Sequence, residues 1–278
     1  SAVTVLSAAD PVRVFQSFAT LDLLSRGRAE LVVGRGSFVE AYPLFGLELE
    51  EYDSLFAEKL DLLLALRKDT HVHWSGHHRP ALTGQGVYPR PLQNPLPIWV
   101  GIGGSPESAV RAGTLGLPLM IAIIGGEPHR FRPFVDLYLK AGDEAGHPRE
   151  QLRVGVHVFG YVGETDQQAA DDFFPGYQRM FTKSGAERGW RPVSRAQYEA
   201  TRGPTGAYMI GDAKTVAQKV IQMSHALGGL SRVSFQMTNV LLPHEKMKRA
   251  IERLGTKVAP LVRTELSEEG TTAKGKSK

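Results

Sequence analysis

The sequence predicts an α/β fold built on a parallel sheet, and three features of the chain indicate it. Short apolar runs rich in β-branched residues recur, a glycine or polar turn follows each run, and a segment with helical periodicity comes next. Each run is largely apolar on both faces, as a buried parallel strand is. The predicted strands lie at residues 2–6, 30–34, 97–102, 117–124, 152–162 and 232–237.

Predicted helix starts lie between these strands in the sequence. Four residues are predicted to accept hydrogen bonds from the free N–H groups of a first turn: Asp10, Ser105, Thr165 and Asp212. Proline follows two of them, at positions 11 and 106, where its missing N–H costs nothing. After Pro11, and again over 55–66, apolar residues recur at helical spacing, so one face of each helix is expected in the core.

The number of units points to a barrel that is incomplete in this chain. A closed (β/α)8 barrel needs eight units of roughly 30 residues each, and the chain supplies six and opens directly on the apolar run 2–6. We therefore expect a TIM (β/α)8-type barrel that lacks its first two βα units, in a trimmed chain or a reduced barrel. One domain is expected over 1–265, with insertions near 71–97 and 173–204 and a disordered tail over 266–278.

Composition excludes several classes of function. With 42% hydrophobic residues and no apolar run of membrane-spanning length, the chain is an ordinary globular one. Without cysteine it has no disulfide, thiolate metal site or cysteine nucleophile, which is consistent with a cytoplasmic protein. The net charge of +4 is too small to indicate a nucleic-acid partner.

The segment 97–113 carries the first candidate site. A buried strand ends there in three glycines, Gly101, Gly103 and Gly104, and Ser105 caps the helix that follows. Free N–H groups at a helix start favour an anion such as phosphate, and Ser105 and Ser108 add hydroxyl donors on one face of the first turn. A tight turn with a capping serine is the equally weighted alternative.

The segment 32–46 carries the second candidate. Arg35 stands between Gly34 and Gly36 where a strand ends, so its guanidinium can present a fork to a phosphate. An exposed arginine in a turn is the alternative. Aromatic residues at 38, 42 and 45 are more typical of a core than of a ring-stacking site.

The sequence gives little support for a metal site or a catalytic nucleophile. The histidines at 71, 73, 77 and 78 have no acidic residue among them and no HExxH spacing, so no metal site is predicted. His157 lies inside a predicted strand and is interpreted as a barrel-interior histidine. A GxSxG elbow, a Walker A loop and a paired-carboxylate motif are all absent from the sequence.

The sequence resembles the bacterial luciferase-like flavin-dependent monooxygenase family over nearly its whole length. The resemblance rests on DPVRVFQSFATLDLLSRGRAELVVGRG (10–36), PLPIWVGIGGSPESAVRAGTLGLPLMI (95–121), RFRPFVDLYLKAGDEAGHP (130–148), GDAKTVAQKV (211–220) and LPHEKMKRAIERLGTKVAPLVR (242–263). It implies a TIM barrel, reduced FMN as co-substrate and oxidation of a small aldehyde, ketone or similar substrate by oxygen through a C4a-peroxyflavin. It also implies a homodimer and a separate flavin reductase. The insertion 173–204 follows a predicted strand, where lids over active sites are found, and is expected to form a lid around Trp190.

By position, the resemblance assigns the FMN phosphate to Arg35, Gly36, Ser37, Gly103, Gly104, Ser105 and Ser108. Asp53 stands where members of the family often have an arginine, and the family's catalytic histidine lies in a part that this chain lacks, so no catalytic base is assigned. Two alternatives stay open. Members of the family that use the deazaflavin F420 transfer hydride without oxygen, and reduced barrels bind flavin without catalysis.

Overall fold

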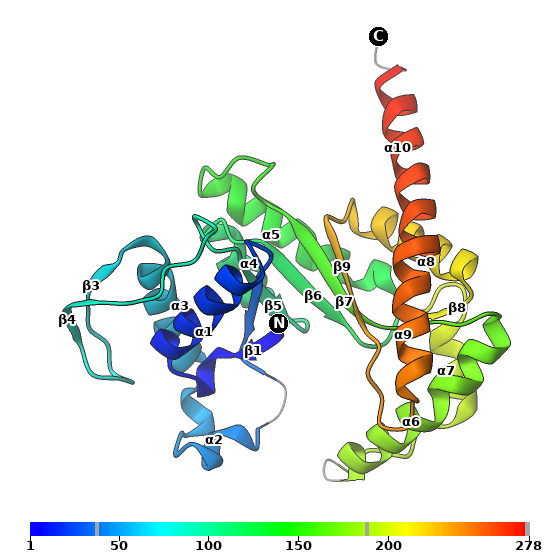
Figure 1. The fold of residues 1–278 in the computed structure, drawn as a ribbon, viewed down its shortest axis with the longest axis horizontal. Helices are drawn as coiled ribbons and strands as arrows, with labels where there is room; N and C mark the ends of the chain where they lie inside the picture. The colour runs from blue at the N-terminus through cyan, green and yellow to red at the C-terminus, as the bar shows by residue number, and fades with distance from the viewer. Residues whose placement is uncertain (37–38, 187–188, 276–278) are drawn as a thin grey trace. The chain divides into compact units, whose positions relative to one another are not determined.

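A computed structural model describes residues 1–36, 39–186 and 189–275 of the chain (Figure 1). The contacts within it group into two compact units. One unit contains residues 1–120 and 140–152, and the other contains residues 121–139 and 153–278. The sequence predicted one barrel domain over 1–265, and that assignment stays a prediction.

The first unit contains three parallel strands in the order β1, β2, β5. The register of β2 against β5 pairs Leu31 with Ile98 and Val32 with Trp99. Val32, Trp99 and Met120 pack together in the core. The elements are β1 (Ala2–Val5), η1 (Leu6–Ala8), α1 (Pro11–Leu24), β2 (Leu31–Gly34), α2 (Ala41–Leu44), η2 (Leu49–Glu51), α3 (Tyr52–Lys68), β3 (His71–Trp74), β4 (Leu82–Gly86), β5 (Ile98–Ile102) and α4 (Pro106–Thr114).

Helix α1 shows why these predicted elements form where they do. The side chain of Asp10 accepts hydrogen bonds from the N–H groups of Val12 and Arg13, as expected of an N-cap. At the other end, the fully buried Asp22 carboxylate accepts bonds from Gln93 N at 2.8 Å and Ala29 N at 3.2 Å. These bonds fix the segments that lead into β2 and β5, and they satisfy a charge that burial would otherwise penalise.

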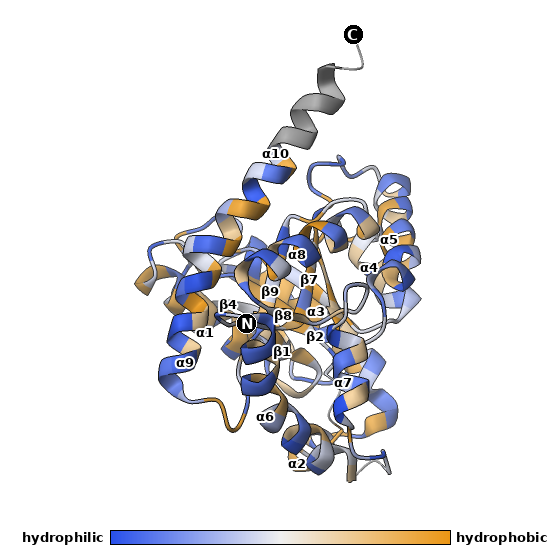
Figure 2. Cartoon of the chain, turned by 90° about the vertical axis from the view of Figure 1, so that its right-hand side faces the viewer, coloured by the Kyte–Doolittle hydropathy of each residue, from blue (hydrophilic) through white to orange (hydrophobic). Residues whose placement is uncertain are grey.

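The second unit is organised around β7 (Val154–Val162). Its first half pairs in parallel with β9 (Arg232–Gln236) and its second half with β8 (Met209–Gly211). The helices are η3 (Pro128–Phe131), α6 (Asp166–Ala186), α7 (Arg195–Arg202), α8 (Ala213–Leu227), α9 (His244–Arg253), η4 (Leu254–Val258) and α10 (Ala259–Gly275). Figure 2 shows α9 as largely hydrophilic and the strands β7 and β9 as more hydrophobic. Strand β6 (Leu119–Ile123) and helix α5 (Arg132–Glu144) each contribute residues to both units.

Aromatic side chains form the core of the second unit. The ring of Phe159 on β7 lies 5.7 Å from that of Tyr177 on α6 and 5.5 Å from that of Tyr208. The hydroxyls of Tyr177 and Tyr208 are 2.6 Å apart, and Tyr208 donates a further bond to Ile124 O. Buried tyrosine hydroxyls are therefore paired in this cluster, as a stable core requires.

The structure confirms most of the predicted elements. All four predicted N-caps accept backbone hydrogen bonds, and the segment 71–97 contains the antiparallel hairpin β3–β4. Strand β8 was missed. The segment 173–204 contains the second half of α6 and α7, and α10 extends through Gly275. The insertions and the disordered tail stay predictions.

Candidate functional site

The candidate site lies in the first unit, where strands β2 and β5 end. Because the two strands are parallel neighbours, their carboxyl ends meet at one edge of the sheet. Arg35 follows β2 directly, and the turn Gly103–Ser105 follows β5. The two predicted halves of the anion site thus leave the sheet at the same edge, where parallel α/β proteins bind ligands.

The turn after β5 leaves its backbone open. Gly103 and Gly104 are exposed, and Gly104 has a φ of 132°, which side-chain-bearing residues rarely adopt. A Cβ built on Gly103 would meet no atom within 4 Å. Empty space therefore lies over the peptide that leads into α4.

Helix α4 begins with the predicted cap. The Ser105 hydroxyl accepts a hydrogen bond from Ser108 N at 3.3 Å, and Pro106 occupies the first helical position. The same hydroxyl donates to the Glu107 carboxylate at 2.9 Å. Ser108 is 5% exposed, so its side chain is less accessible than that of Ser105.

The pKa of Glu107 lies below its ordinary value. The carboxylate accepts hydrogen bonds from its own backbone N–H and from Ser105, and the positive charge of Arg35 lowers the pKa further. Arg35 therefore contributes to the electrostatic environment of the first turn of α4. A carboxylate, however, already occupies part of the positive end of the helix.

Residues of α3 already interact with Arg35. Its Nη1 donates to the Asp53 carboxylate at 2.6 Å and to the Tyr52 hydroxyl. The guanidinium carbon lies 4.4 Å from the centre of the Tyr52 ring, a cation–π distance. The Arg35 side chain is 20% exposed, so it can reach a ligand, but a phosphate must share it with Asp53.

The remaining predicted phosphate-binding residues are Gly36 and Ser37. Gly36 has a φ of 84°, and a Cβ there would meet Val5 Cγ1 at 2.9 Å, so glycine is required by both conformation and packing. Ser37 lies outside the described residues, as does Phe38. Tyr42 is 3% exposed and belongs to the core, whereas Phe45 is exposed.

Two features of the site escaped the sequence prediction. Asp53 was noted as a replacement, but its pairing with Arg35, eighteen positions away, has no local signal. Arg111 on α4 was not considered at all. Its guanidinium lies over the Phe56 ring at 5.6 Å, and its Nη1 is a buried polar atom with no hydrogen-bond partner among the described residues.

The other predicted side chains are accounted for locally. His157 on β7 lies within 3.2 Å of Ser234 Oγ and of Gln236 Oε1 on β9, consistent with its interpretation as a satisfied strand histidine. The described residues contain no group of three potential metal ligands. Trp190 is 56% exposed in the segment between α6 and α7.

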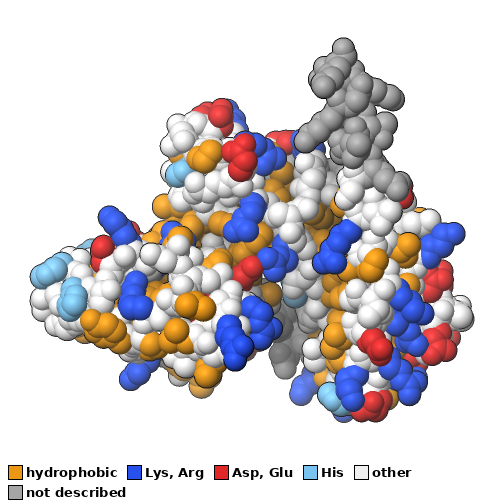
Figure 3. All heavy atoms as spheres, turned by 45° about the horizontal axis from the view of Figure 1, so that its top comes forward, with side chains coloured by type: hydrophobic (Ala, Val, Ile, Leu, Met, Phe, Trp, Pro, Cys, Tyr) orange, Lys and Arg blue, Asp and Glu red, His pale blue; other side chains and the backbone are white. Residues whose placement is uncertain are grey.

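Surface features add two observations. On the face shown in Figure 3, lysine and arginine side chains are interspersed with aspartate and glutamate. In the part of the chain that the structure describes, no helix combines the length and the apolar character needed to cross a bilayer.

Comparison with known proteins shows one family. The model of the luciferase-like monooxygenases matches residues 1–230. Among curated relatives, an F420-dependent glucose-6-phosphate dehydrogenase of Amycolatopsis mediterranei is 34% identical over 110 residues, which cover 38% of this chain and 32% of the relative. The match thus spans about a third of that relative's length.

Solved structures show the same fold. The monooxygenase RslO1 from Streptomyces bottropensis aligns with a TM-score of 0.77 at 20% identity, over 92% of this chain and 75% of that one. The oxygenating constituent of 3,6-diketocamphane monooxygenase from Pseudomonas putida, solved with FMN, aligns with a TM-score of 0.70 at 17% identity, over 94% and 78%. These matches confirm the predicted TIM-barrel-type α/β fold class.

Proposed function

Because the chain belongs to the luciferase-like monooxygenase family, we propose that it is a flavin-dependent monooxygenase, which oxidises a small organic substrate such as an aldehyde or ketone with reduced FMN and oxygen. One observation supports this most strongly. Arg35 and the open turn Gly103–Ser105 follow neighbouring parallel strands at the same edge of the sheet, and the turn leaves open space over Gly103. They form a cradle for one anionic group.

Each residue of this cradle would have a separate role toward the FMN phosphate. The backbone at Gly103 and Gly104 offers N–H donors without a side chain in the way, and the Ser105 hydroxyl adds a donor if it releases Glu107. Arg35 supplies the charge that partly neutralises the phosphate. Bound reduced FMN would supply the electrons that activate oxygen, while the protein orients the flavin and excludes water.

A second candidate is an F420-dependent oxidoreductase that transfers hydride. The specific observation in its favour is the pair of carboxylates, Asp53 and Glu107, that already contact the donors of the cradle. A phosphate monoester such as FMN approaches two negative charges near pH 7, whereas the phosphodiester of F420 carries one. Repulsion from two carboxylates therefore favours the diester, and one relative is described as F420-dependent.

Several further features remain part of the proposal. A separate reductase would deliver reduced flavin, and the protein would act as a cytoplasmic homodimer on a substrate held near a lid around Trp190. No catalytic base is proposed. A flavin-binding protein without catalysis is the outcome if binding occurs without turnover.

Two parallel reactions test the proposed activity. In one, the chain receives photoreduced FMN under argon, then ¹⁸O₂ and a panel of aldehydes and ketones, and mass spectrometry follows incorporation of one ¹⁸O atom into product. In the other, it receives F420 and alcohols, and the visible absorbance of the deazaflavin is followed. Label in the product supports the monooxygenase, and F420 reduction without labelled product refutes it.

A further inference from the structure

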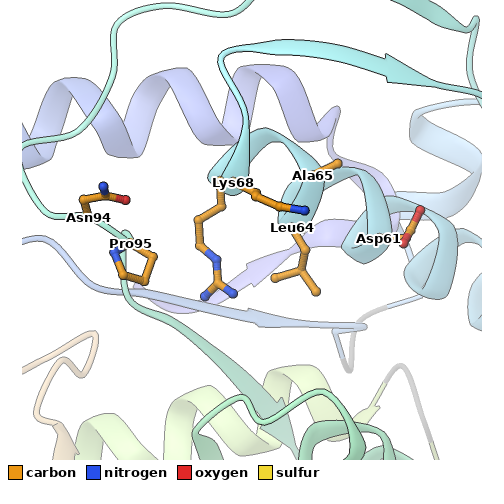
Figure 4. A pocket seen from close by; sticks show the side chains of 7 residues that line it. Asp61, Leu64, Ala65, Lys68, Asn94 and Pro95 are labelled. Carbon is orange, nitrogen blue, oxygen red and sulfur yellow. The ribbon is translucent and has the colours of Figure 1, made fainter.

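A pocket in the first unit, separate from the cradle, lies on the exposed face of α3 near its carboxyl end. It has a volume of about 480 Å³, within the range of small-molecule sites. Figure 4 shows Asp61, Leu64, Ala65 and Lys68 on the helix, and Asn94 and Pro95 on the segment that leads to β5. The lining residues are Asp61, Leu64, Ala65, Arg67, Lys68, Asn94 and Pro95.

The pocket lies at the opposite end of α3 from the candidate cradle. Asp53, which holds Arg35, is in the first turn of the helix, and Arg67 is in the last. At 1.5 Å per residue the fourteen positions between them span roughly 20 Å. A ligand in this pocket would not touch the cradle.

Arg67 and Lys68 carry charges that have no partner here. Neither side chain makes a hydrogen bond or an ion pair within the described residues. Burial lowers the pKa of the Arg67 guanidinium, and no acidic group offsets that effect. The acidic residue of the pocket, Asp61, instead accepts a hydrogen bond from Trp74 Nε1 at 2.8 Å.

Basic residues in the last turn of a helix ordinarily serve the helix itself, by neutralising its free carbonyls. In α3 a different residue does this. Arg90 donates to Leu66 O at 2.8 Å, to Arg67 O at 3.0 Å and to Asp69 O at 3.1 Å, and its guanidinium is held over the Phe15 ring. With the helix end already capped, the guanidinium of Arg67 and the ammonium of Lys68 are available to a ligand.

We propose that this pocket binds a small organic anion, with its carboxylate or phosphate head group on Arg67 and Lys68 and its apolar body on Leu64, Ala65 and Pro95. The guanidinium fork matches either head group in a bidentate arrangement. The exposed Asn94 amide, at the edge of the pocket, offers a further donor. The apolar lining residues favour an anion with an apolar body over a bare inorganic ion.

Calorimetric titration tests the proposal on the full chain carrying Arg35→Ala and Ser105→Ala, which removes the side-chain donors of the cradle and so weakens phosphate binding there. The probes are phenyl phosphate, benzoate and the uncharged phenol. We expect saturable binding of at least one anion, weakened about tenfold or more by Arg67→Gln and less by Arg67→Lys. Lys140→Gln, which removes an exposed lysine elsewhere, is the matched control and should change nothing.

The outcomes separate the sources of binding. Preference for phenyl phosphate or for benzoate identifies the head group. Equal binding of phenol, or an affinity that Arg67→Gln leaves unchanged, overturns the proposal, as does the absence of saturable binding to any probe. Because Arg67→Gln could unfold the helix end, urea unfolding of each variant is measured first, and Arg67→Lys keeps the test valid if Arg67→Gln does not fold.

Discussion

Replacing Asp53 by asparagine should strengthen the binding of phosphorylated flavin. In the structure the Asp53 carboxylate holds Arg35 Nη1 at 2.6 Å. A bound phosphate has to share that guanidinium and to approach a like charge. Asparagine keeps the size of the side chain but removes both obstacles, so the dissociation constant for FMN should fall while that for riboflavin, which has no phosphate, should not.

The expected size of the effect follows from exposure. The Asp53 side chain is 61% exposed, so solvent screens its pairing with Arg35, and exposed pairs of this kind contribute about 0.2–1 kcal/mol. Repulsion between the carboxylate and a phosphate a few ångströms away adds about 1 kcal/mol in water. Together, about 1–2 kcal/mol corresponds to ~5- to 30-fold tighter binding. The gain should shrink as salt is added.

Quenching of flavin fluorescence measures both dissociation constants at low and high salt. Glu50→Gln is the matched control, because it removes one negative charge near the same helix start without touching the recorded partners of Arg35. Equal tightening of FMN and riboflavin, or equal effects of the two substitutions, would refute the idea that Asp53 competes with the phosphate.

Three further outcomes are expected. Gly103→Ala should change the free energy of unfolding in urea by less than about 0.5 kcal/mol, because the space over Gly103 is empty. It should weaken FMN binding, because the added methyl group takes up the space proposed for the phosphate. Gly101→Ala should lower the free energy of unfolding by about 1–3 kcal/mol, because its Cβ would meet Val3 Cγ1 at 2.8 Å. Equal stability of the two variants would contradict this packing. Lys219→Met should lower the free energy of unfolding by about 2–4 kcal/mol, because the buried ammonium donates to three carbonyls of the segment 202–206. In the wild type, burial lowers the pKa of Lys219 from 10.5 to about 8. Between about pH 8 and 10.5 the unfolded chain therefore binds more protons than the folded chain, so the free energy of unfolding should rise with pH. If the same rise persists in Lys219→Met, another group causes it.

Much of the fold could be predicted because its signals are local. Capping residues such as Asp10 and Ser105 act within three positions, and apolar runs identify strands without knowledge of their neighbours. Strand β8 has three residues and pairs with the end of β7. Three residues are too few for a hydrophobic periodicity that would predict a strand. Its existence depends on tertiary contact.

The start of helix α6 was predicted at Thr165, but its continuation beyond residue 173 was not, for a different reason. Pro175 and Gly176 lie inside it and normally indicate a break. Gly176 is required by packing, since a Cβ there would lie 1.8 Å from Asn239 Oδ1. Gly176 weakens the helix locally, but it is required because Asn239, distant in the sequence, occupies the space that a side chain would take.

At the candidate site, too, local sequence signals could be predicted and long-range contacts could not. Glycines and a capping serine at the end of β5 are visible as a motif, and Arg35 stands out between two glycines. The charges that oppose a phosphate come from Asp53, which pairs with Arg35 across eighteen positions, and from Glu107, which accepts a hydrogen bond from Ser105. Sequence spacing therefore indicated the donors of the site but not their competitors.

Titration of the chain with FMN, riboflavin and F420, under argon and monitored by fluorescence, tests the phosphate cradle most directly. We expect saturable binding of a phosphorylated cofactor that is clearly tighter than that of riboflavin, and loss of that difference in the variant carrying Arg35→Ala and Ser105→Ala. Binding of FMN and riboflavin with equal affinity, or a variant that binds FMN as well as the wild type does, would contradict it.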